Sequence, residues 1–139
     1  GLLQAFPRHA IVVHGPPSIV GQFAGTDRVT PYEQKPVRQL FEKISAADLV
    51  IAPDSFALHL ASLYDVPAVG YFGPAHPHRF RPTAPGSSSL FRQPECSPCL
   101  QSRGDSPCAK GLTQCISLAQ LSPGDFIGAA QTALSRPAG

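Results

Sequence analysis

The residues best suited to chemistry stand together at Asp54, Ser55 and His59, where a short apolar run gives way to a helical pattern. The N–H groups of a helix's first turn, together with the helix dipole, bind anions, and Ser55 or His59 can add a hydrogen bond to a diphosphate. The same residues also fit a structural role, in which Asp54 and Ser55 cap the helix and His59 packs against its neighbours. Taken without further information, this segment favours the structural role.

A second group consists of the four cysteines, which all fall within one short segment at Cys96, Cys99, Cys108 and Cys115. Four thiolates can close a tetrahedral site, and zinc or iron suits sulfur ligands. Such a site would be structural, because it leaves no coordination position open for catalysis. Free thiols packed in a loop, disulfides, and a redox role for Cys96 and Cys99 are the alternatives. The Cys-x-x-Cys pair does not follow a strand and begin a helix, as thioredoxin-like sites do.

A third group, which follows Gly73 and Pro74, contains two imidazoles and two guanidiniums: His76, His78, Arg79 and Arg81. A guanidinium can hold a phosphate through two hydrogen bonds, and an imidazole can bind a sugar hydroxyl. For each residue taken singly, a solvated basic loop is the simpler interpretation. We expect at least one of them to touch a ligand. We do not expect the histidines to bind metal, because the cysteines already complete a set of four.

Strands and helices alternate in the elements that must position these groups. The patterns predict the following elements in chain order: a strand over 10–14 ended by Gly15, a helix over 36–47, a strand over 48–53, a helix from Ser55 to about Tyr64, and a strand over 67–72 ended by Gly73. This order indicates an α/β, Rossmann-like fold with a parallel sheet and flanking helices. Ligands bind beyond the carboxyl ends of such strands, which is where Gly15, Asp54 and Gly73 fall.

Helical spacing predicts which side chains are buried. The first helix should bury Val37, Leu40, Phe41 and Ile44, and the second should present Phe56, Leu60 and Leu63 to the core. The segment 75–94 has no periodicity, so an irregular loop is expected there. Ser122 and Pro123 should begin a last helix that ends at Leu134.

Length and composition exclude several classes of protein. The chain has 139 residues, of which 42% are hydrophobic and 14% charged, as expected for one globular domain. The net charge of +2, without runs of like charge, argues against nucleic-acid binding or a polybasic membrane anchor. No apolar stretch approaches the roughly 20 residues of a membrane span, and a signal peptide is absent, so a cytoplasmic protein is expected. The opening at Gly1, without Met, suggests a fragment of a longer protein.

With these residues in view, the stretch from Asp54 to Pro74 resembles the ADP-heptose:lipopolysaccharide heptosyltransferases. The family has an Asp-Ser/Thr-Gly-x-x-His-Leu-Ala turn followed by a strand and Phe-Gly-Pro-Thr. Here Asp54-Ser55, three residues and His59-Leu60-Ala61 are followed by the strand that ends in Phe72-Gly73-Pro74. The region 40–48 and the strand that ends at Gly15 also resemble the family, so the resemblance covers nearly the whole chain.

The resemblance implies the C-terminal, donor-binding half of a GT-B glycosyltransferase with two Rossmann-like domains. In this reading residues 1–74 form the core of a single partial domain, 75–120 a loop with the four cysteines, and 121–139 the C-terminal helix. The enzyme would be bacterial and cytoplasmic, working in the cytoplasm or at the inner face of the inner membrane. It would transfer a glycosyl group from ADP-heptose or a related donor to a lipopolysaccharide core, a glycan or a protein. The nucleotide-sugar site would consist of Gly15, Asp54, Ser55, Phe56, Ala57, His59, Gly73, Pro74, His76 and Arg79.

The same resemblance bears on catalysis and cofactors. The catalytic carboxylate belongs to the N-terminal domain, so this chain should carry no catalytic residue and should not transfer sugar without that domain. No redox coenzyme is expected. Many relatives share a Cys-x-Pro-Cys segment with two further cysteines, and some members of the autotransporter-modifying branch hold iron there. This implies iron or zinc at Cys96, Cys99, Cys108 and Cys115.

Three positions depart from the family pattern. Phe56 stands where the family has Gly, Ala75 replaces Thr, and no Glu follows Gly15 to hold a ribose. A bulky Phe56 obstructs the close approach of a phosphate to the backbone. Phe56 therefore supports an alternative, a non-catalytic binding or scaffold module with a structural metal-thiolate loop. A stand-alone metal-thiolate redox or regulatory protein would leave the pattern from Asp54 to Pro74 unexplained.

Overall fold

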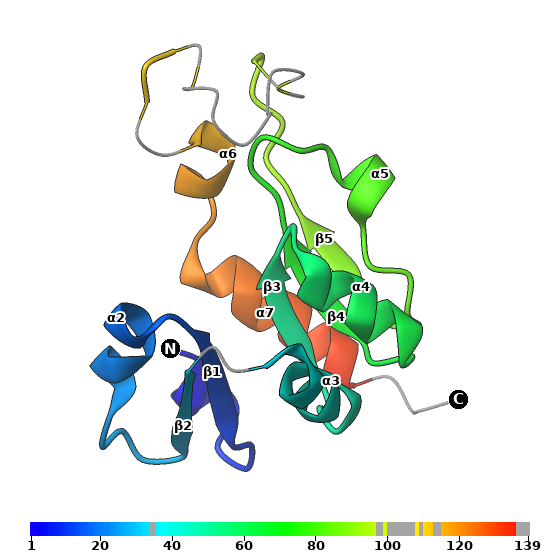
Figure 1. Ribbon diagram of the computed structural model, residues 1–139. Coiled ribbons are helices and arrows are strands. Elements are labelled where there is room, and N and C mark those ends of the chain that lie inside the picture. Colours follow the sequence, from blue (N-terminus) through cyan, green and yellow to red (C-terminus); the bar gives the residue numbers. More distant parts are fainter. Residues whose placement is uncertain (34–35, 97–98, 100–107, 109, 113–114, 136–139) are drawn as a thin grey trace. The chain divides into compact units, whose positions relative to one another are not determined.

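The computed structural model describes residues 1–33, 36–96, 99, 108, 110–112 and 115–135. The backbone divides into two compact units, which we call unit 1 (residues 1–42) and unit 2 (residues 43–139). Each unit contains a parallel sheet with helices beside it (Figure 1). The predicted α/β, Rossmann-like class is therefore confirmed. None of the helices in the described ranges is long and apolar enough to cross a bilayer.

Unit 1 is a two-stranded parallel sheet with short helices. Its elements are α1 (Leu2–Ala5), β1 (Ile11–Gly15), α2 (Pro17–Val20), the 3-10 helix η1 (Gly21–Phe23) and β2 (Val29–Glu33). The strands pair from Ile11 opposite Val29 to Gly15 opposite Glu33. The prediction of β1 is confirmed, but β2 was not predicted. Pro31 interrupts its pattern, and a proline is tolerated there because β2 has a partner on one side only among the described strands.

Helix α3 (Val37–Ser45) begins in unit 1 and ends in unit 2, and it confirms the helix predicted over 36–47. Its predicted apolar face is only partly buried. Ile44 is buried, and Leu40 and Phe41 are half-buried, but Val37 is 56% exposed. The prediction that Val37 is buried is wrong, because the first turn of α3 lies outside the packed part of the helix.

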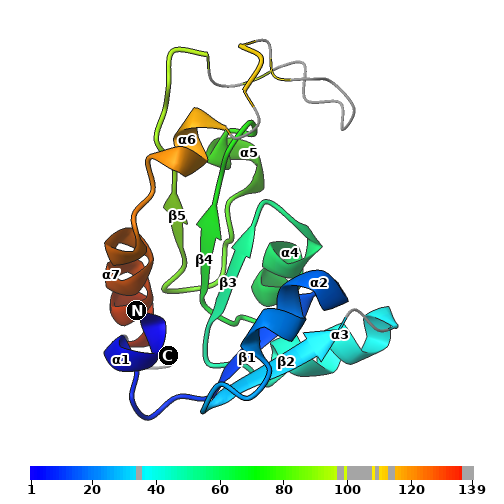
Figure 2. The ribbon, with the colours of Figure 1, turned by 90° about the vertical axis from the view of Figure 1, so that its left-hand side faces the viewer.

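Unit 2 is a three-stranded parallel sheet covered on both faces. The strands β3 (Val50–Pro53), β4 (Ala68–Tyr71) and β5 (Ser88–Leu90) lie in the order β3-β4-β5. Helices α4 (Phe56–Leu63) and α7 (Pro123–Leu134) lie against opposite faces of the sheet (Figures 1 and 2). The ring of Phe126 from α7 packs edge-on against Tyr71 of β4, with 5.4 Å between the ring centroids. The predicted β3, β4, α4 and α7 are confirmed.

Of the three α4 side chains predicted to face the core, Leu60 is buried, but Phe56 and Leu63 are not. Leu58, Leu60 and Ala61 are buried, whereas Phe56 is 51% and Leu63 72% exposed. Nearly every residue of α4 is apolar, so its spacing could not select a face. The sheet selects it: a Cβ built on Gly70 would stand 2.9 Å from the Leu58 side chain, so the absence of a side chain at Gly70 lets Leu58 pack against β4.

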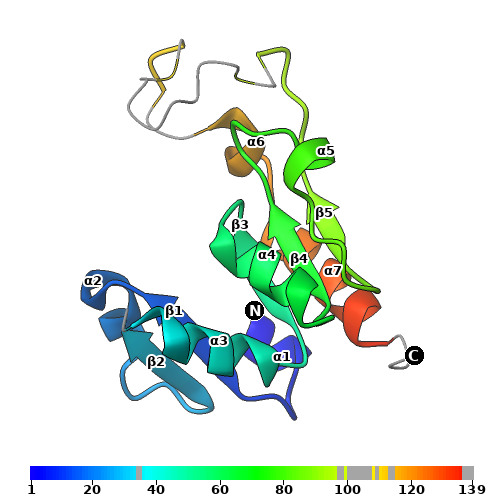
Figure 3. The same cartoon turned by 45° about the vertical axis from the view of Figure 1, so that its right-hand side comes forward.

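The segment 75–94 is more regular than predicted. It contains α5 (Pro77–Phe80) and β5, and β5 pairs with β4 from Ser88 opposite Val69 to Leu90 opposite Tyr71. This strand is short and rich in serine, so it carries no apolar pattern that could predict it. Pairing with the edge of β4 that β3 does not occupy determines its position. Helices α5 and α6 (Ile116–Ala119) lie beyond the carboxyl ends of the strands of unit 2 (Figures 2 and 3).

Candidate functional site

The carboxyl ends of β3 and β4 form the floor of the candidate site in unit 2. Pro53 pairs with Tyr71, and the Asp54 N–H donates to the Tyr71 carbonyl over 3.2 Å. The chain therefore leaves β3 toward Ser55 and leaves β4 toward Gly73 from neighbouring points of one sheet edge. The structure brings the Asp54–His59 turn and the Gly73–Pro74 turn to the same edge of the sheet.

Ser55 is the N-cap residue of α4, as predicted, but its side chain does not cap the helix. Its backbone is extended, and the Leu58 N–H bonds to the Ser55 carbonyl over 3.1 Å. The Ser55 Oγ is buried and has no hydrogen-bond partner among the residues that the structure describes. A buried hydroxyl without a partner costs on the order of 1–3 kcal/mol. This atom can gain a hydrogen bond to a ligand once the side chain turns or the atoms that cover it move aside.

The other residues of this turn are accessible. Asp54 and His59 are exposed, Ala57 is half-buried, and Phe56 stands at the first helical position. The exposure of His59 disagrees with the packing role that the sequence also allowed. A helix N-terminus with an accessible imidazole and a buried, unpartnered hydroxyl is suited to bind a phosphate oxygen.

The Gly73–Pro74 turn packs closely against Leu118, Cys115 and Cys99. Gly73 is buried, and a Cβ built on it would stand 3.2 Å from the Leu118 side chain and 3.3 Å from the Cβ of Cys115. The Pro74 carbonyl accepts the Cys99 N–H over 3.0 Å, while the Pro74 ring is exposed. A side chain at position 73 would be tightly packed, so Leu118 or Cys115 would have to shift by a few tenths of an ångström to admit one.

Some side chains of the basic segment after this turn already make hydrogen bonds or ring contacts within the protein. The His76 Nδ1 accepts the His78 N–H over 3.1 Å and caps α5, and the His76 ring lies edge-on to Phe91 with centroids 5.1 Å apart. The Arg79 guanidinium carbon lies 5.2 Å from the centroid of the Phe80 ring. Arg79 and Arg81 are exposed, and α5, which contains Arg79, follows the Gly73–Pro74 turn in the chain.

The four cysteines are free thiols, each half-buried. Burial raises the pKa of the Cys99 thiol, and the charges of Cys96, Cys108 and Cys115 raise it further. Backbone N–H groups of Leu112 and Lys110 lower the pKa of Cys108. The described residues contain no group of three His, Cys, Asp or Glu side chains that could hold a metal ion as they stand. The metal site remains a prediction.

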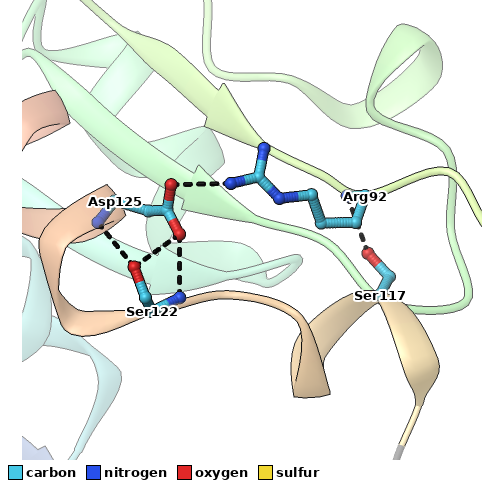
Figure 4. Close-up of polar contacts among 4 residues, drawn as sticks. All are labelled: Arg92, Ser117, Ser122 and Asp125. Carbon is cyan, nitrogen blue, oxygen red and sulfur yellow. Dashed lines mark hydrogen bonds and ion pairs between the residues drawn. The ribbon is translucent and has the colours of Figure 1, made fainter.

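A separate polar cluster lies at the start of α7 (Figure 4). Ser122 and Asp125 form a reciprocal cap, and Arg92 donates to the Asp125 carboxylate over 2.7 Å. The Ser122 backbone N–H and hydroxyl, and then the Arg92 guanidinium, hold the pKa of Asp125 below its ordinary value. Its partners are all present within the protein, so this cluster has a structural role.

Gly15, another predicted site residue, ends β1 in unit 1. This unit has a hollow of about 430 Å³ between the second half of β2 and the α2–η1 segment, lined by Val20, Gly21, Ala24, Pro31, Tyr32 and Glu33. The Tyr32 hydroxyl bonds to the Gln39 side chain over 2.7 Å, and the Tyr32 ring lies 5.6 Å from that of His14. Tyr32 and Glu33 were missed because β2 was missed. Recognition of Val29–Glu33 as a strand would have placed Tyr32 and Glu33 at a strand end, where site residues were sought.

Comparison with known proteins identifies one family. The model of glycosyltransferase family 9 (heptosyltransferase) matches residues 36–109, more than half of the 139-residue chain. The matched residues include α3, β3, α4, β4, α5 and β5, and with them both turns of the candidate site. No curated protein and no solved structure matches the chain.

Proposed function

The chain belongs to glycosyltransferase family 9 (heptosyltransferase), and on this basis we propose that its β3–α4 and β4–α5 turns bind the diphosphate of a nucleotide-sugar donor. The proposed donor is ADP-heptose or a related nucleotide sugar. The acceptor is a lipopolysaccharide core, a glycan or a protein, and it is held by a second domain that also supplies the catalytic carboxylate. The proposed setting is the cytoplasm of a bacterium, and the free thiols are compatible with its reducing environment.

The observation that carries this proposal is the Ser55 hydroxyl. It is buried at the N-terminus of α4, has no partner among the described residues, and belongs to a helix whose own cap it does not form. Buried polar groups are nearly always paired in folded proteins, so an exception at a helix N-terminus points to a missing anionic partner. At the start of α7, by contrast, the hydroxyl of the N-cap residue Ser122 has hydrogen-bond partners, as expected for a serine that only caps a helix.

The proposed reaction breaks the bond between the anomeric carbon and the diphosphate oxygen of the donor. Negative charge then accumulates on the diphosphate. The N-terminus of α4, the Ser55 hydroxyl and the His59 imidazole compensate that charge, and Arg79 adds a positive charge at the same sheet edge. This chain thus orients the donor and stabilises the leaving group, and the second domain deprotonates the acceptor.

We also propose that Cys96, Cys99, Cys108 and Cys115 hold a structural iron or zinc ion. The donor set suits either metal, and the charges of Cys96, Cys108 and Cys115 each raise the pKa of Cys99, which supports a position of all three near Cys99. As they stand in the described part of the chain, no three of them form a metal-binding group. The ion would stabilise this segment and would take no part in sugar transfer.

A second candidate function rests on Phe56. This residue stands at the first position of α4 with 51% of its surface exposed, where it can obstruct the approach of a phosphate to the backbone. In that case the domain would be a non-catalytic binding or scaffold module.

Calorimetric titration of the chain with ADP, an ADP-sugar, UDP and GDP separates the two candidates. We expect selective binding of ADP and the ADP-sugar, weakened by Ser55→Ala and by His59→Ala. Ser122→Ala is the matched control, because it removes the other N-cap serine of unit 2. Absence of nucleotide binding by the folded chain would reject the donor site and favour the scaffold module.

A further inference from the structure

Three successive residues at the end of β4 are each held by the cysteine segment or by α6. The Ser117 hydroxyl donates to the Phe72 carbonyl over 2.8 Å. Gly73 packs against Leu118 and Cys115, and the Pro74 carbonyl accepts the Cys99 N–H. We refer to Cys99, Cys115, Ser117 and Leu118 as the turn clamp, because together they contact every residue of the Phe72–Pro74 turn.

Ser117 is the central member of the turn clamp. It is the only polar side chain that is fully buried among the described residues. Besides donating to Phe72, its oxygen accepts the Arg92 N–H over 3.1 Å, so one hydroxyl joins the ends of β4 and β5 (Figure 4). Arg92 in turn bonds to Asp125 at the start of α7. Hydrogen bonds therefore connect the turn, through Ser117 and Arg92, to the start of α7.

The same contacts join the candidate site to the cysteines. Cys99 bonds to the turn through its backbone N–H, and its thiol donates to the Cys96 carbonyl over 3.6 Å. Cys115 is the N-cap residue of α6 and touches the Gly73 position with its Cβ. Cys99 and Cys115 therefore contact the Phe72–Pro74 turn beside Ser117 and Leu118.

We propose that Ser117 and Leu118 are positioning residues for the diphosphate site. This inference rests on the proposed donor site. Its physical basis is that a preorganised turn keeps its groups in place before the ligand arrives, and a loosened turn must be ordered at the expense of binding.

The first test compares Ser117→Ala with Ser87→Ala. Both remove a serine hydroxyl bonded to the backbone of β4, because the Ser87 Oγ accepts the Ala68 N–H over 2.9 Å at the opposite end of the strand. We expect Ser117→Ala to weaken ADP binding about tenfold and Ser87→Ala to change it less than about twofold. Hydrogen exchange of the free protein should show faster exchange at the Phe72–Ala75 amides in Ser117→Ala only.

The outcomes distinguish failure of this inference from failure of the proposed function. If the parent chain binds no ADP, the donor site itself is rejected, and the inference falls with it. If the parent binds ADP but the two variants weaken binding equally, Ser117 contributes only general stability and the positioning role is rejected. Faster exchange at the turn without weaker ADP binding would also reject it.

A second pair of variants tests Leu118. Gly73→Ala should weaken ADP binding, because its Cβ meets the Leu118 side chain, and the additional change Leu118→Ala should restore part of the affinity. Gly128→Ala is the control, because a Cβ there has nothing within 4 Å. Failure of Leu118→Ala to restore any affinity would show that α6 does not set the position of the turn.

Discussion

Two helices of unit 2 begin with a serine, and the two serines have different environments. At α7, the Ser122 oxygen accepts the Asp125 N–H over 3.3 Å, and its hydroxyl and backbone N–H both donate to the Asp125 carboxylate. At α4, the Ser55 hydroxyl has no partner in the described part of the chain. The N-terminus of α7 is satisfied by its own side chains, and that of α4 is not.

The residue three positions after each serine explains the difference. The Asp125 carboxylate accepts hydrogen bonds from Ser122 and so completes a reciprocal cap. Arg92, which follows β5 in the chain, donates to the same carboxylate. The corresponding residue of α4 is Leu58, which is fully buried in the core and cannot reciprocate. A satisfied helix start stabilises the fold, whereas an unsatisfied one remains available to a ligand. This contrast separates a structural serine from a candidate binding residue of the same type.

The largest expected effect is on ligand binding at α4. Ser55→Ala should weaken ADP binding roughly tenfold or more, because a hydrogen bond to a charged group contributes about 1.5–3 kcal/mol. Thermal unfolding should show little loss of stability, since the lost hydroxyl has no partner within the described protein. Equal ADP affinities of Ser55→Ala and the parent, measured by calorimetry, would remove the reason to treat the two serines differently.

The opposite result is expected at α7. Ser122→Ala should lower the free energy of unfolding by about 1 kcal/mol, the usual cost of losing an N-cap, and leave ADP affinity unchanged. Urea denaturation measures the first quantity and calorimetry the second. A loss of ADP affinity comparable to that of Ser55→Ala would show that both helix starts act on the ligand.

A smaller effect is expected from Phe56. Phe56→Gly should strengthen ADP binding a few-fold, because glycine lets a phosphate approach the first turn of α4 closely. Phe56→Leu is the matched control, since it keeps a bulky apolar side chain. An unchanged or weaker affinity of Phe56→Gly would show that the phenyl ring does not obstruct the site and would weaken the scaffold alternative.

The smallest effect concerns pH. The partners of Asp125 lower its pKa in the folded chain below the ordinary value of 3.8, so its contribution to stability is present above that value and is lost as pH falls through the lowered pKa. The stability difference between the parent and Asp125→Asn should thus be constant near neutral pH and shrink in acid. Urea denaturation across pH 2–7 checks this, and a difference that grows in acid would contradict it.

Local signals in the sequence were enough to place the main elements. Apolar runs ended by glycine or proline located β1, β3 and β4, and Ser55 and Ser122 located the starts of two helices. These signals depend on neighbouring residues, so they can be read without knowing what the chain packs against. The turns of the candidate site follow directly from them.

Tertiary contacts decided what those signals could not. The buried face of α4 was set by Gly70 across the sheet, and the serine-rich β5 was set by the open edge of β4. The two N-cap serines looked alike in sequence, and only their surroundings showed that one is paired and the other is not. The tight packing around Gly73 comes from α6, more than 40 residues later. The sequence by itself determined which residues stand at the strand ends, because strand ends are marked locally, whereas packing between distant segments decided which of them remain open to a ligand.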